Sequence, residues 1–322
     1  MGPSTWRSFR RVTAVAVTSC AVMTAIAGGA AADTPPGTTV VTTQSLTWTC
    51  GWSNGCVNAG WWPLGTGDMN GDGHRDMVWQ NETTRKVDTW LLDGKGRVTG
   101  SKTITGATAP VKAQAVIADM NGDGVTDIVI WGSAQVPPVI WLLDGDGHVT
   151  TTQSVPSGCD ASGSEPCGLI GGAGADLNAD GHTDIVSHNW TTGVLTALYL
   201  NGAGGVIGTQ ALSWTCALPD CAGYWWPDGF ADVNGDGHPD LTWDNSHSGV
   251  VSSWLLGPGG VVTGTQDINW TCSLSSGCSN SWKPVGVGDM NDDHQPDFTW
   301  WNTTTGEVSS WLLNPTMPLS LR

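Results

Sequence analysis

The sequence predicts an all-β protein, specifically a five-bladed β-propeller with four strands in each blade. Three observations support this class: an Asp-rich motif occurs five times, aromatic residues recur in register with it, and only 13% of the 322 residues are charged. The chain has 20 Trp and 45 Gly, but its only Glu are Glu82, Glu165 and Glu307. A helical bundle or coiled coil needs far more Ala, Leu, Glu and Lys, so a helical fold is excluded.

The repeat extends well beyond the Asp-rich motif. The motifs are DMNGDGHRD from Asp68, DMNGDGVTD from Asp119, DLNADGHTD from Asp176, DVNGDGHPD from Asp232 and DMNDDHQPD from Asp289. At one later position in every unit the residues are Trp90, Trp141, Leu198, Trp254 and Trp311. The spacings between motifs are 51, 57, 56 and 57 residues, and a unit of this length with four strand-like segments is typical of one propeller blade.

The first unit shows how each blade divides into strands. Its expected strands are Trp61 to Gly67, Asp76 to Gln80, Val87 to Leu92 and Val98 to Ile104. The Asp-rich loop separates the first two strands, a polar turn at Asn81 to Lys86 follows the second, and a Gly-containing turn, DGKG, precedes the fourth. These segments leave no room for a helix.

The two ends of the chain predict how the ring closes. The last unit has no regular fourth strand after Leu313, whereas Thr38 to Cys50 matches the segment that follows the third strand in other units, such as Val261 to Cys272. Pairing this N-terminal strand with the last blade closes the ring and removes exposed sheet edges. An open solenoid is the alternative, but it would not need a displaced strand.

The N-terminal segment has the pattern of a secretory signal peptide over residues 1–32. Arg7, Arg10 and Arg11 precede an apolar stretch from Val12 to Ala27, and three Ala before Asp33 form a cleavage site. The apolar stretch is too short for a transmembrane anchor of about 20 residues. We therefore expect a secreted, extracellular protein with a short linker at 33–36 and one propeller over 37–322.

The cysteines that follow the signal segment are even in number, which indicates disulfides in a secreted chain. They fall in four close pairs, Cys50/Cys56, Cys159/Cys167, Cys216/Cys221 and Cys272/Cys278. Connectivity is not deducible from sequence alone, but each pair has an equivalent place in a repeat, which favours four local bridges. Metal binding by these cysteines is disfavoured because no His lies at ligand spacing from each pair.

The Asp-rich motifs predict calcium loops. In D-x-N-x-D-G-x-x-D, side-chain oxygens at positions 1, 3, 5 and 9 and the carbonyl at position 7 can surround a hard cation, while Gly at position 6 permits a sharp turn. An all-oxygen set suits calcium better than a transition metal. Turns held only by hydrogen bonds are the alternative, but they would leave the ligand carboxylates repelling one another.

About five structural calcium ions are expected. The candidate ligands are Asp68, Asn70, Asp72, His74 and Asp76; Asp119, Asn121, Asp123, Val125 and Asp127; Asp176, Asn178, Asp180, His182 and Asp184; Asp232, Asn234, Asp236, His238 and Asp240; and Asp289, Asn291, Asp293, Gln295 and Asp297. An EF-hand is excluded because Trp79 stands where that loop needs its twelfth-position Glu. In the fifth loop, His294 replaces the expected Gly, which we expect to strain the turn.

These loops, placed between the first two strands of a Trp-rich blade, resemble the FG-GAP/VCBS repeats of integrin α-type propellers and their secreted bacterial and fungal relatives. The resemblance covers residues 37–322 and implies a calcium-binding β-propeller that binds a partner. Integrin-type propellers have seven blades, so the expected number of five rests on the strands counted in this sequence.

Strand directions predict two different faces for the ring. The calcium loops share one face with the turns between third and fourth strands. The other face carries the cysteines, several Trp and polar turns, a combination that suits sugars because their CH groups stack on Trp while their hydroxyls bond to amides. Candidate ligand-binding residues there are Trp52, Trp61, Asn81, Trp225, Asn245, Trp282 and Asn302. The recurring Trp79 and Trp90 positions are interpreted as core, and His188 and His247 as solvated turn residues.

The net charge of −17 disfavours nucleic acid and anionic membranes as partners. The leading hypothesis is a calcium-stabilised, non-catalytic module that binds carbohydrate, such as a cell-surface glycan or polysaccharide. One alternative is a scaffold that binds an extracellular protein. Another is a glycoside hydrolase, which needs a pair of carboxylates. Asp160, Glu165, Asp220 and Asp228 lie on the expected binding face, but no non-repeated pair is marked by spacing, so no catalytic residue is assigned.

Overall fold

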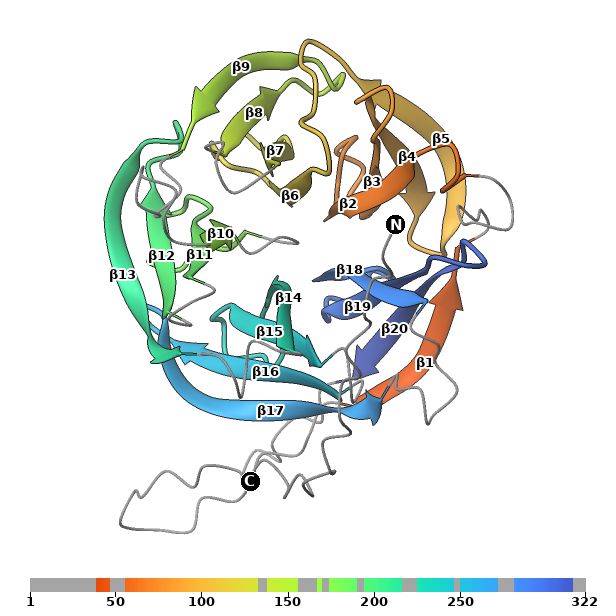
Figure 1. Cartoon of the computed structure of the whole chain (residues 1–322). Helices are drawn as coiled ribbons and strands as arrows, with labels where there is room; N and C mark the ends of the chain where they lie inside the picture. The colour runs from red at the N-terminus through yellow and green to blue at the C-terminus, as the bar shows by residue number, and fades with distance from the viewer. Residues whose placement is uncertain are drawn as a thin grey trace, which may run out of the picture. The chain divides into compact units, whose positions relative to one another are not determined.

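The computed structural model describes residues 39–46, 56–132, 138–155, 167–169, 174–189, 194–215, 225–245, 250–271 and 281–314. They belong to one compact unit, Pro35–Arg322. Within these ranges the chain forms five antiparallel four-stranded sheets and no helix, and the sheets surround a common axis as the blades of a propeller (Figure 1). The predicted fold class is therefore confirmed.

The strands of the first blade agree with the sequence prediction to within one residue at each end. Blade one consists of β2 (Trp61–Gly67), β3 (Asp76–Asn81), β4 (Val87–Asp93) and β5 (Arg97–Ile104). Blade two consists of β6 (Gln114–Ala118), β7 (Asp127–Trp131), β8 (Val139–Leu143) and β9 (Val149–Ser154). Blade three consists of β10 (Cys167–Leu169), β11 (Ile185–Asn189), β12 (Val194–Leu200) and β13 (Val206–Thr215), and blade four of β14 (Trp225–Ala231), β15 (Asp240–Asn245), β16 (Val250–Gly257) and β17 (Val261–Thr271).

The fifth blade joins the two ends of the described chain. It consists of β18 (Trp282–Gly288), β19 (Asp297–Asn302), β20 (Val308–Asn314) and β1 (Thr39–Ser45), in the order β1-β20-β19-β18. β1 is antiparallel to β20, with Thr43 opposite Trp311, and forms the outermost strand (Figure 1). Val40 and Leu46 are buried, so this segment also contributes to the core. Closure of the ring by the N-terminal strand agrees with the prediction.

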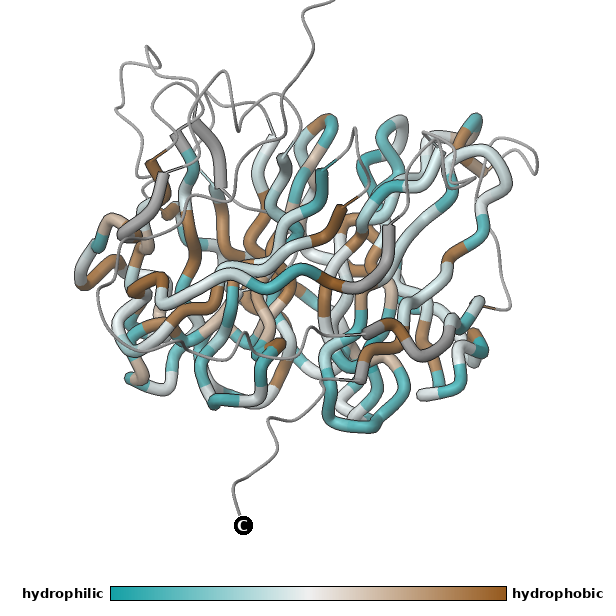
Figure 2. The backbone as a smooth tube through the Cα atoms, turned by 90° about the horizontal axis from the view of Figure 1, so that it is seen from below, coloured by the Kyte–Doolittle hydropathy of each residue, from teal (hydrophilic) through white to brown (hydrophobic). Residues whose placement is uncertain are grey.

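The hydrophobic core consists of five clusters, one between each pair of neighbouring blades. The cluster between blades one and two includes Val78 and Ile128, and the cluster between blades five and one includes Trp79 and Trp301. Hydrophobic positions accordingly gather in the middle of the strands and hydrophilic ones toward the two rims (Figure 2). Because each blade packs on both neighbours, closure completes a fifth cluster that an open array would expose.

The innermost strands of blades one, four and five share an irregularity that places one side chain in the interior. The register shifts between Pro63 and Gly65 in β2, and at the equivalent prolines of β14 and β18. The bulged residues are Leu64, Asp228 and Val285, all at most 8% exposed. A β-bulge re-aims the strand locally, so blade four buries a carboxyl where the others bury an aliphatic group.

Hydrogen bonds confirm the predicted assignment of loops to two faces. The turn after β3 contacts the loop before β2, since the Glu82 N–H donates to the Gly60 carbonyl at 2.7 Å. The equivalent contact in blade five joins Thr303 to Ser281. On the opposite face, Gly94 of the β4–β5 turn lies against Asp292 of the fifth Asp-rich loop. We call the two faces the turn face and the Asp-loop face.

Several sequence predictions fall outside the described residues. These are the signal peptide over 1–32, the linker at 33–36, Trp52 and the following paired cysteines: Cys50, Cys159, Cys216, Cys221, Cys272 and Cys278. Cys56 is disulfide-bonded, and Cys167 lies in β10. The local pairings Cys50/Cys56, Cys159/Cys167, Cys216/Cys221 and Cys272/Cys278 therefore stay predictions.

A membrane-spanning helix was not expected after the signal segment. Within the described ranges, no helix has the length and apolar character needed to cross a membrane.

Candidate functional site

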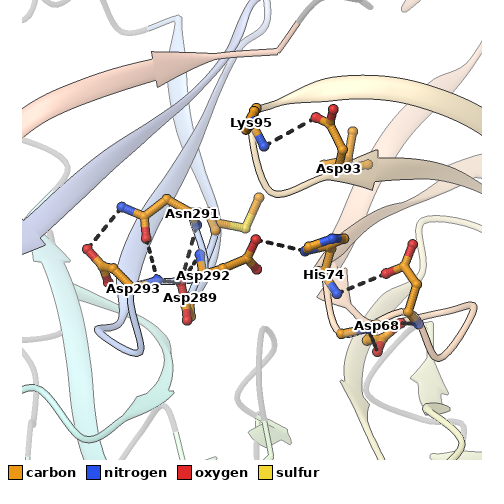
Figure 3. A network of polar contacts seen from close by, with 12 residues as sticks. Asp68, His74, Asp93, Lys95, Asp289, Asn291, Asp292 and Asp293 are labelled. Carbon is orange, nitrogen blue, oxygen red and sulfur yellow. Dashed lines mark hydrogen bonds and ion pairs between the residues drawn. The ribbon is translucent and has the colours of Figure 1, made fainter.

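Four of the Asp-rich loops share one hydrogen-bond arrangement, and the third differs in lacking the bond from the N–H at position 4. In the first loop, the Asp68 carboxylate accepts the N–H groups of Gly71 at 2.7 Å and Gly73 at 2.9 Å. The Asp72 carboxylate accepts the Asn70 side-chain amide and the His74 N–H, each at 2.9 Å. Figure 3 shows part of the same arrangement in the fifth loop, around Asp289, Asn291 and Asp293. The side chains at positions 1, 3 and 5 are therefore turned toward their own loop.

The carboxylate at position 9 connects each loop to the blade behind it. Asp76 accepts the Met69 N–H at 2.9 Å and the Leu92 N–H of β4 at 2.8 Å, and it has no exposed surface. Burial, together with the smaller effect of the nearby Asp72 and Asp68 carboxylates, raises the pKa of Asp76 to about 6, while the two backbone hydrogen bonds oppose that shift. The same two contacts and the same direction of pKa shift occur at Asp127, Asp184, Asp240 and Asp297.

The loops turn through left-handed backbone at positions 4 and 6. In the first loop these positions are Gly71 and Gly73, with φ of 75° and 91°. In the fifth loop they are Asp292 and His294, with φ of 66° and 65°. A residue with a Cβ loses roughly 1–2 kcal/mol in this conformation. The strain expected at His294 is thus present, whereas the sequence analysis did not foresee the same conformation at Asp292.

The donor chemistry of the loops fits a hard cation, since each offers three carboxylates, a side-chain amide oxygen and a backbone carbonyl. In the parts of the chain that the structure describes, however, no three His, Cys, Asp or Glu side chains converge as a metal-holding group. The oxygens instead receive N–H groups of the loop. Calcium binding by the predicted ligands therefore remains a proposal, supported by oxygen chemistry and by the proximity of buried and partly buried carboxylates.

The fifth loop contacts the first loop across the closure of the ring. The Asp292 carboxylate lies 2.8 Å from His74 Nδ1 (Figure 3), and this hydrogen bond raises the pKa of His74. A Cβ at Gly94 would overlap Asp292 Oδ2, so a larger residue there would displace the Asp292 carboxylate from this place. Asp292 thus replaces the usual Gly at a strained position and places its carboxylate between the first and last blades.

A cavity of about 720 Å³ lies on the ring axis at the Asp-loop face. Every blade contributes to its wall, including the first Asp of four loops, Asp68, Asp119, Asp232 and Asp289. Arg75 also lines it and donates to the Thr66 carbonyl at 2.6 Å. Burial lowers the pKa of Arg75, while Asp289 and Asp68 oppose that shift. This axial cavity was not predictable from the repeat pattern, which indicated ligand binding on the other face.

On the turn face, three of the predicted ligand-binding Trp occupy equivalent places. Trp61, Trp225 and Trp282 each begin an innermost strand, and each pairs with the Asn that ends the second strand. All three are half-buried, and the neighbouring Trp226 is 46% exposed. The core interpretation of Trp79, Trp243 and Trp300 agrees with their exposure of at most 4%.

The paired Asn residues are mostly occupied within the protein. Asn81 is buried; its amide donates to the Ala59 carbonyl, and its oxygen accepts the N–H groups of Thr83 and Thr84. Asn302 holds its turn in the same way. Asn245 is half-buried. Asn81 and the side-chain oxygen of Asn302 therefore serve their turns in this structure, which leaves little of the Asn81 amide to a ligand.

The interpretation of His188 as a solvated turn residue was wrong. His188 lies within β11, has no exposed surface and packs edge-on against Trp243, with ring centroids 6.2 Å apart. The strand continues to Asn189 before the turn, so His188 faces the neighbouring blade. His247 lies outside the described residues.

A second cavity, of about 230 Å³, lies in blade one. Its wall consists of Cys56, Trp61, Trp79, Asp88 and Trp90. The rings of Trp79 and Trp90 are 4.4 Å apart and tilted by 41°. Three indoles and one carboxylate therefore surround a small space that the sequence analysis did not identify.

Blade four contains a buried pair of carboxyls that is not repeated elsewhere in the described chain. Asp228, at the β14 bulge, is 5% exposed and Asp244 of β15 is 7% exposed. Neither oxygen of Asp228 meets an N–H or O–H donor among the described residues. Its neighbour is the Asp244 carboxyl, so a hydrogen bond between them requires that one be protonated. Burial and Asp244 raise the pKa of Asp228 well above its usual value, while burial raises the pKa of Asp244 to about 6 against the opposing charge of Lys283.

This pair bears on the glycoside hydrolase alternative. Sequence reasoning named Asp228 but missed Asp244, although Asp244 is the one acid at its repeat position, where the other blades have Gln80, Trp131, His188 and Trp301. Glycosidases separate their two carboxyls by roughly 5–9.5 Å so that a sugar and water fit between them. Carboxyls close enough to share a hydrogen bond do not leave that space, so the pair does not support this alternative.

The Asp228→Asn variant is expected to flatten the pH dependence of stability. The pKa of Asp228 is higher in the folded than in the unfolded protein. Its contribution to the free energy of unfolding is therefore fully present below the unfolded pKa of about 4, and this contribution is lost as the pH rises through the folded pKa. Asn keeps a donor toward Asp244 without titrating, so we expect the slope to fall by up to about 1.4 kcal/mol per pH unit. Urea unfolding at several pH values in calcium-containing buffer measures this slope. The exposed Asp146→Asn is the control, and equal slopes in all three proteins would contradict the prediction.

The sheet order and the loops together define an FG-GAP-type β-propeller with five blades. The model of the FG-GAP-like repeat family matches residues 68–130, 119–187 and 176–243. These three overlapping matches cover more than half of the chain, and the protein belongs to this family. No curated protein matches the sequence.

Solved structures with similar folds have low sequence identity. A structure of an Agrocybe aegerita lectin that recognises non-reducing terminal N-acetylglucosamine is 17% identical over 77% of this chain and 65% of that chain, with a TM-score of 0.47. The Photorhabdus luminescens Tc holotoxin pore is 13% identical over 79% and 15%, with a TM-score of 0.41. The biofilm matrix protein Bap1 of V. cholerae is 18% identical over 63% and 28%, with a TM-score of 0.29. The chain spans less than two thirds of each of these three.

Proposed function

We propose that this FG-GAP propeller is a secreted, calcium-stabilised, non-catalytic module that binds carbohydrate on its turn face. The observation that supports this function is the repeated placement of Trp61, Trp225 and Trp282 at the start of three innermost strands. Together with the exposed Trp226, they place indole surface on three adjacent blades, four, five and one. Indole surface of this kind can stack on the CH groups of sugars.

The charge of the protein narrows the class of glycan. A net charge of −17 repels polyanionic chains, and only 12 Lys and Arg are available to neutralise them. Neutral or cationic polysaccharides are therefore the proposed ligands. Several equivalent Trp sites on one rigid ring would also raise avidity for a chain with repeated units.

A glycan and polysaccharide binding screen tests this function, with mature protein (residues 33–322) in calcium-containing buffer. We expect binding to at least one neutral or cationic glycan, and at least a tenfold loss of affinity in Trp226→Ala, because truncation removes the exposed stacking surface. Val261→Ala is the matched control, because Val261 is 48% exposed on an outermost strand, away from the turn face. If the folded protein binds no glycan, or if the Trp226→Ala variant binds glycan as tightly as the unaltered protein, the proposal is overturned and a protein partner is favoured.

A further inference from the structure

The Trp pair between β3 and β4 is repeated in three blades, but one residue beside it differs. The ring centroids are 4.4 Å apart for Trp79 and Trp90, and 4.6 Å apart in both the Trp243–Trp254 and Trp300–Trp311 pairs. The residue opposite Trp79 is Asp88, whereas the residues opposite Trp243 and Trp300 are Ser252 and Ser309. Among these three blades, only blade one has a carboxylate directly opposite the first Trp of its pair.

The Asp88 carboxylate lies in the wall of the 230 Å³ cavity together with Trp61, Trp79, Trp90 and the disulfide-bonded Cys56. Asp88 Oδ1 is buried and has no hydrogen-bond partner among the described residues. No Lys, Arg or His in the described part of the chain forms an ion pair with it. Burying a carboxylate oxygen without a partner is costly, so this cavity favours a ligand that brings a positive charge or a donor.

The walls of the cavity select the kind of cation. The faces of indole rings attract cations, and this attraction is stronger in a desolvated site. A calcium ion needs six to eight oxygen ligands, but among the described residues of this wall Asp88 alone has a carboxylate. An organic ammonium group needs fewer oxygens because its carbon atoms contact the rings while its charge meets one carboxylate. The acidic protein also raises the local concentration of cations.

We propose that the blade-one cavity binds an organic ammonium group, with the charge directed at Asp88 and the surrounding CH groups packed against Trp61 and Trp90. Such a group can come from a quaternary amine or from an amino sugar. The inference does not depend on carbohydrate binding at Trp226, although an amino sugar in a polysaccharide would join the two sites.

Isothermal titration calorimetry of mature protein in calcium-containing buffer tests this inference, at a mildly acidic pH where amines are protonated. The probes are choline and glucosamine, each compared with a neutral analogue, dimethylbutanol for choline and glucose for glucosamine. We expect at least one cation to bind at least tenfold more tightly than its analogue. Preference for choline would indicate a quaternary amine, and preference for glucosamine an amino sugar. Absence of binding by both cations, or equal binding of the neutral analogues, would overturn the inference.

Asp88→Ser provides the matched variant, because Ser occupies this place in blades four and five. We expect it to weaken cation binding at least tenfold while the melting temperature stays the same or rises, since a buried carboxylate oxygen without a partner among the described residues is removed. Asp146→Asn is the control for charge alone and should leave binding unchanged. Unaltered binding by Asp88→Ser would contradict the role of this carboxylate. If glycans bind through Trp226 while neither amine binds, this inference fails and the proposed function stands.

Discussion

Deleting residues 33–46 from mature protein is expected to abolish cooperative unfolding of the ring. This deletion removes β1, the outermost strand of blade five, together with the buried Val40 and Leu46. β20 would then present an open edge to solvent, and such edges template association with other chains. We expect a broad thermal transition and soluble aggregates, detected by calorimetry and size-exclusion chromatography.

Complementation in trans controls for unspecific damage by the deletion. A synthetic peptide covering residues 37–47 should restore a cooperative transition to the truncated protein, because it can pair antiparallel to β20 in the native register. A peptide of the same composition in scrambled order should not. A truncated protein that melts as a monomer at an unchanged temperature would show that ring closure contributes little to stability.

Removing calcium is expected to lower the melting temperature strongly. If each Asp-rich loop binds one ion, each contributes about 2.7 kcal/mol when free calcium exceeds its dissociation constant a hundredfold. Five such loops give a sum comparable with the whole free energy of unfolding of an ordinary domain, roughly 5–15 kcal/mol. Calorimetry with calcium and with a chelator measures this difference. Equal melting temperatures in both would contradict structural calcium.

A single-loop variant distinguishes specific sites from general charge screening. Asp72→Ala removes one side chain of the first loop and should lower the number of calcium ions bound by one. Asp146→Ala removes an exposed carboxylate from a β8–β9 turn and should leave that number unchanged. We also expect the fifth loop to bind more weakly, because Asp292 and His294 hold left-handed backbone without Gly. Equal stoichiometry in the two variants would indicate that the ions are not held by the predicted ligands.

Most features that depend on residues close together in the chain were predictable from the amino-acid sequence. The blade strands were predictable because turn residues and alternating β-branched or aromatic residues mark each boundary. The Asp-rich loops were predictable for the same reason, since their contacts span at most a few residues, apart from the bond between position 9 and the third strand. Even the displaced strand at Thr39–Ser45 followed from its similarity to segments in other units.

The tertiary structure decided which polar groups lie together and which are already satisfied. Asp228 meets Asp244 only because a bulge after Pro227 re-aims one strand toward the next. Asp88 lies in a cavity only because β4 places it opposite Trp79, where Cys56 and Trp61 complete the wall. Asn81, expected to face a ligand, is instead occupied by its own turn and by Ala59. The sequence repeat specifies the backbone of each blade. The burial and the hydrogen-bond partners of a side chain depend instead on residues of neighbouring strands and blades, and these residues differ from one repeat to the next.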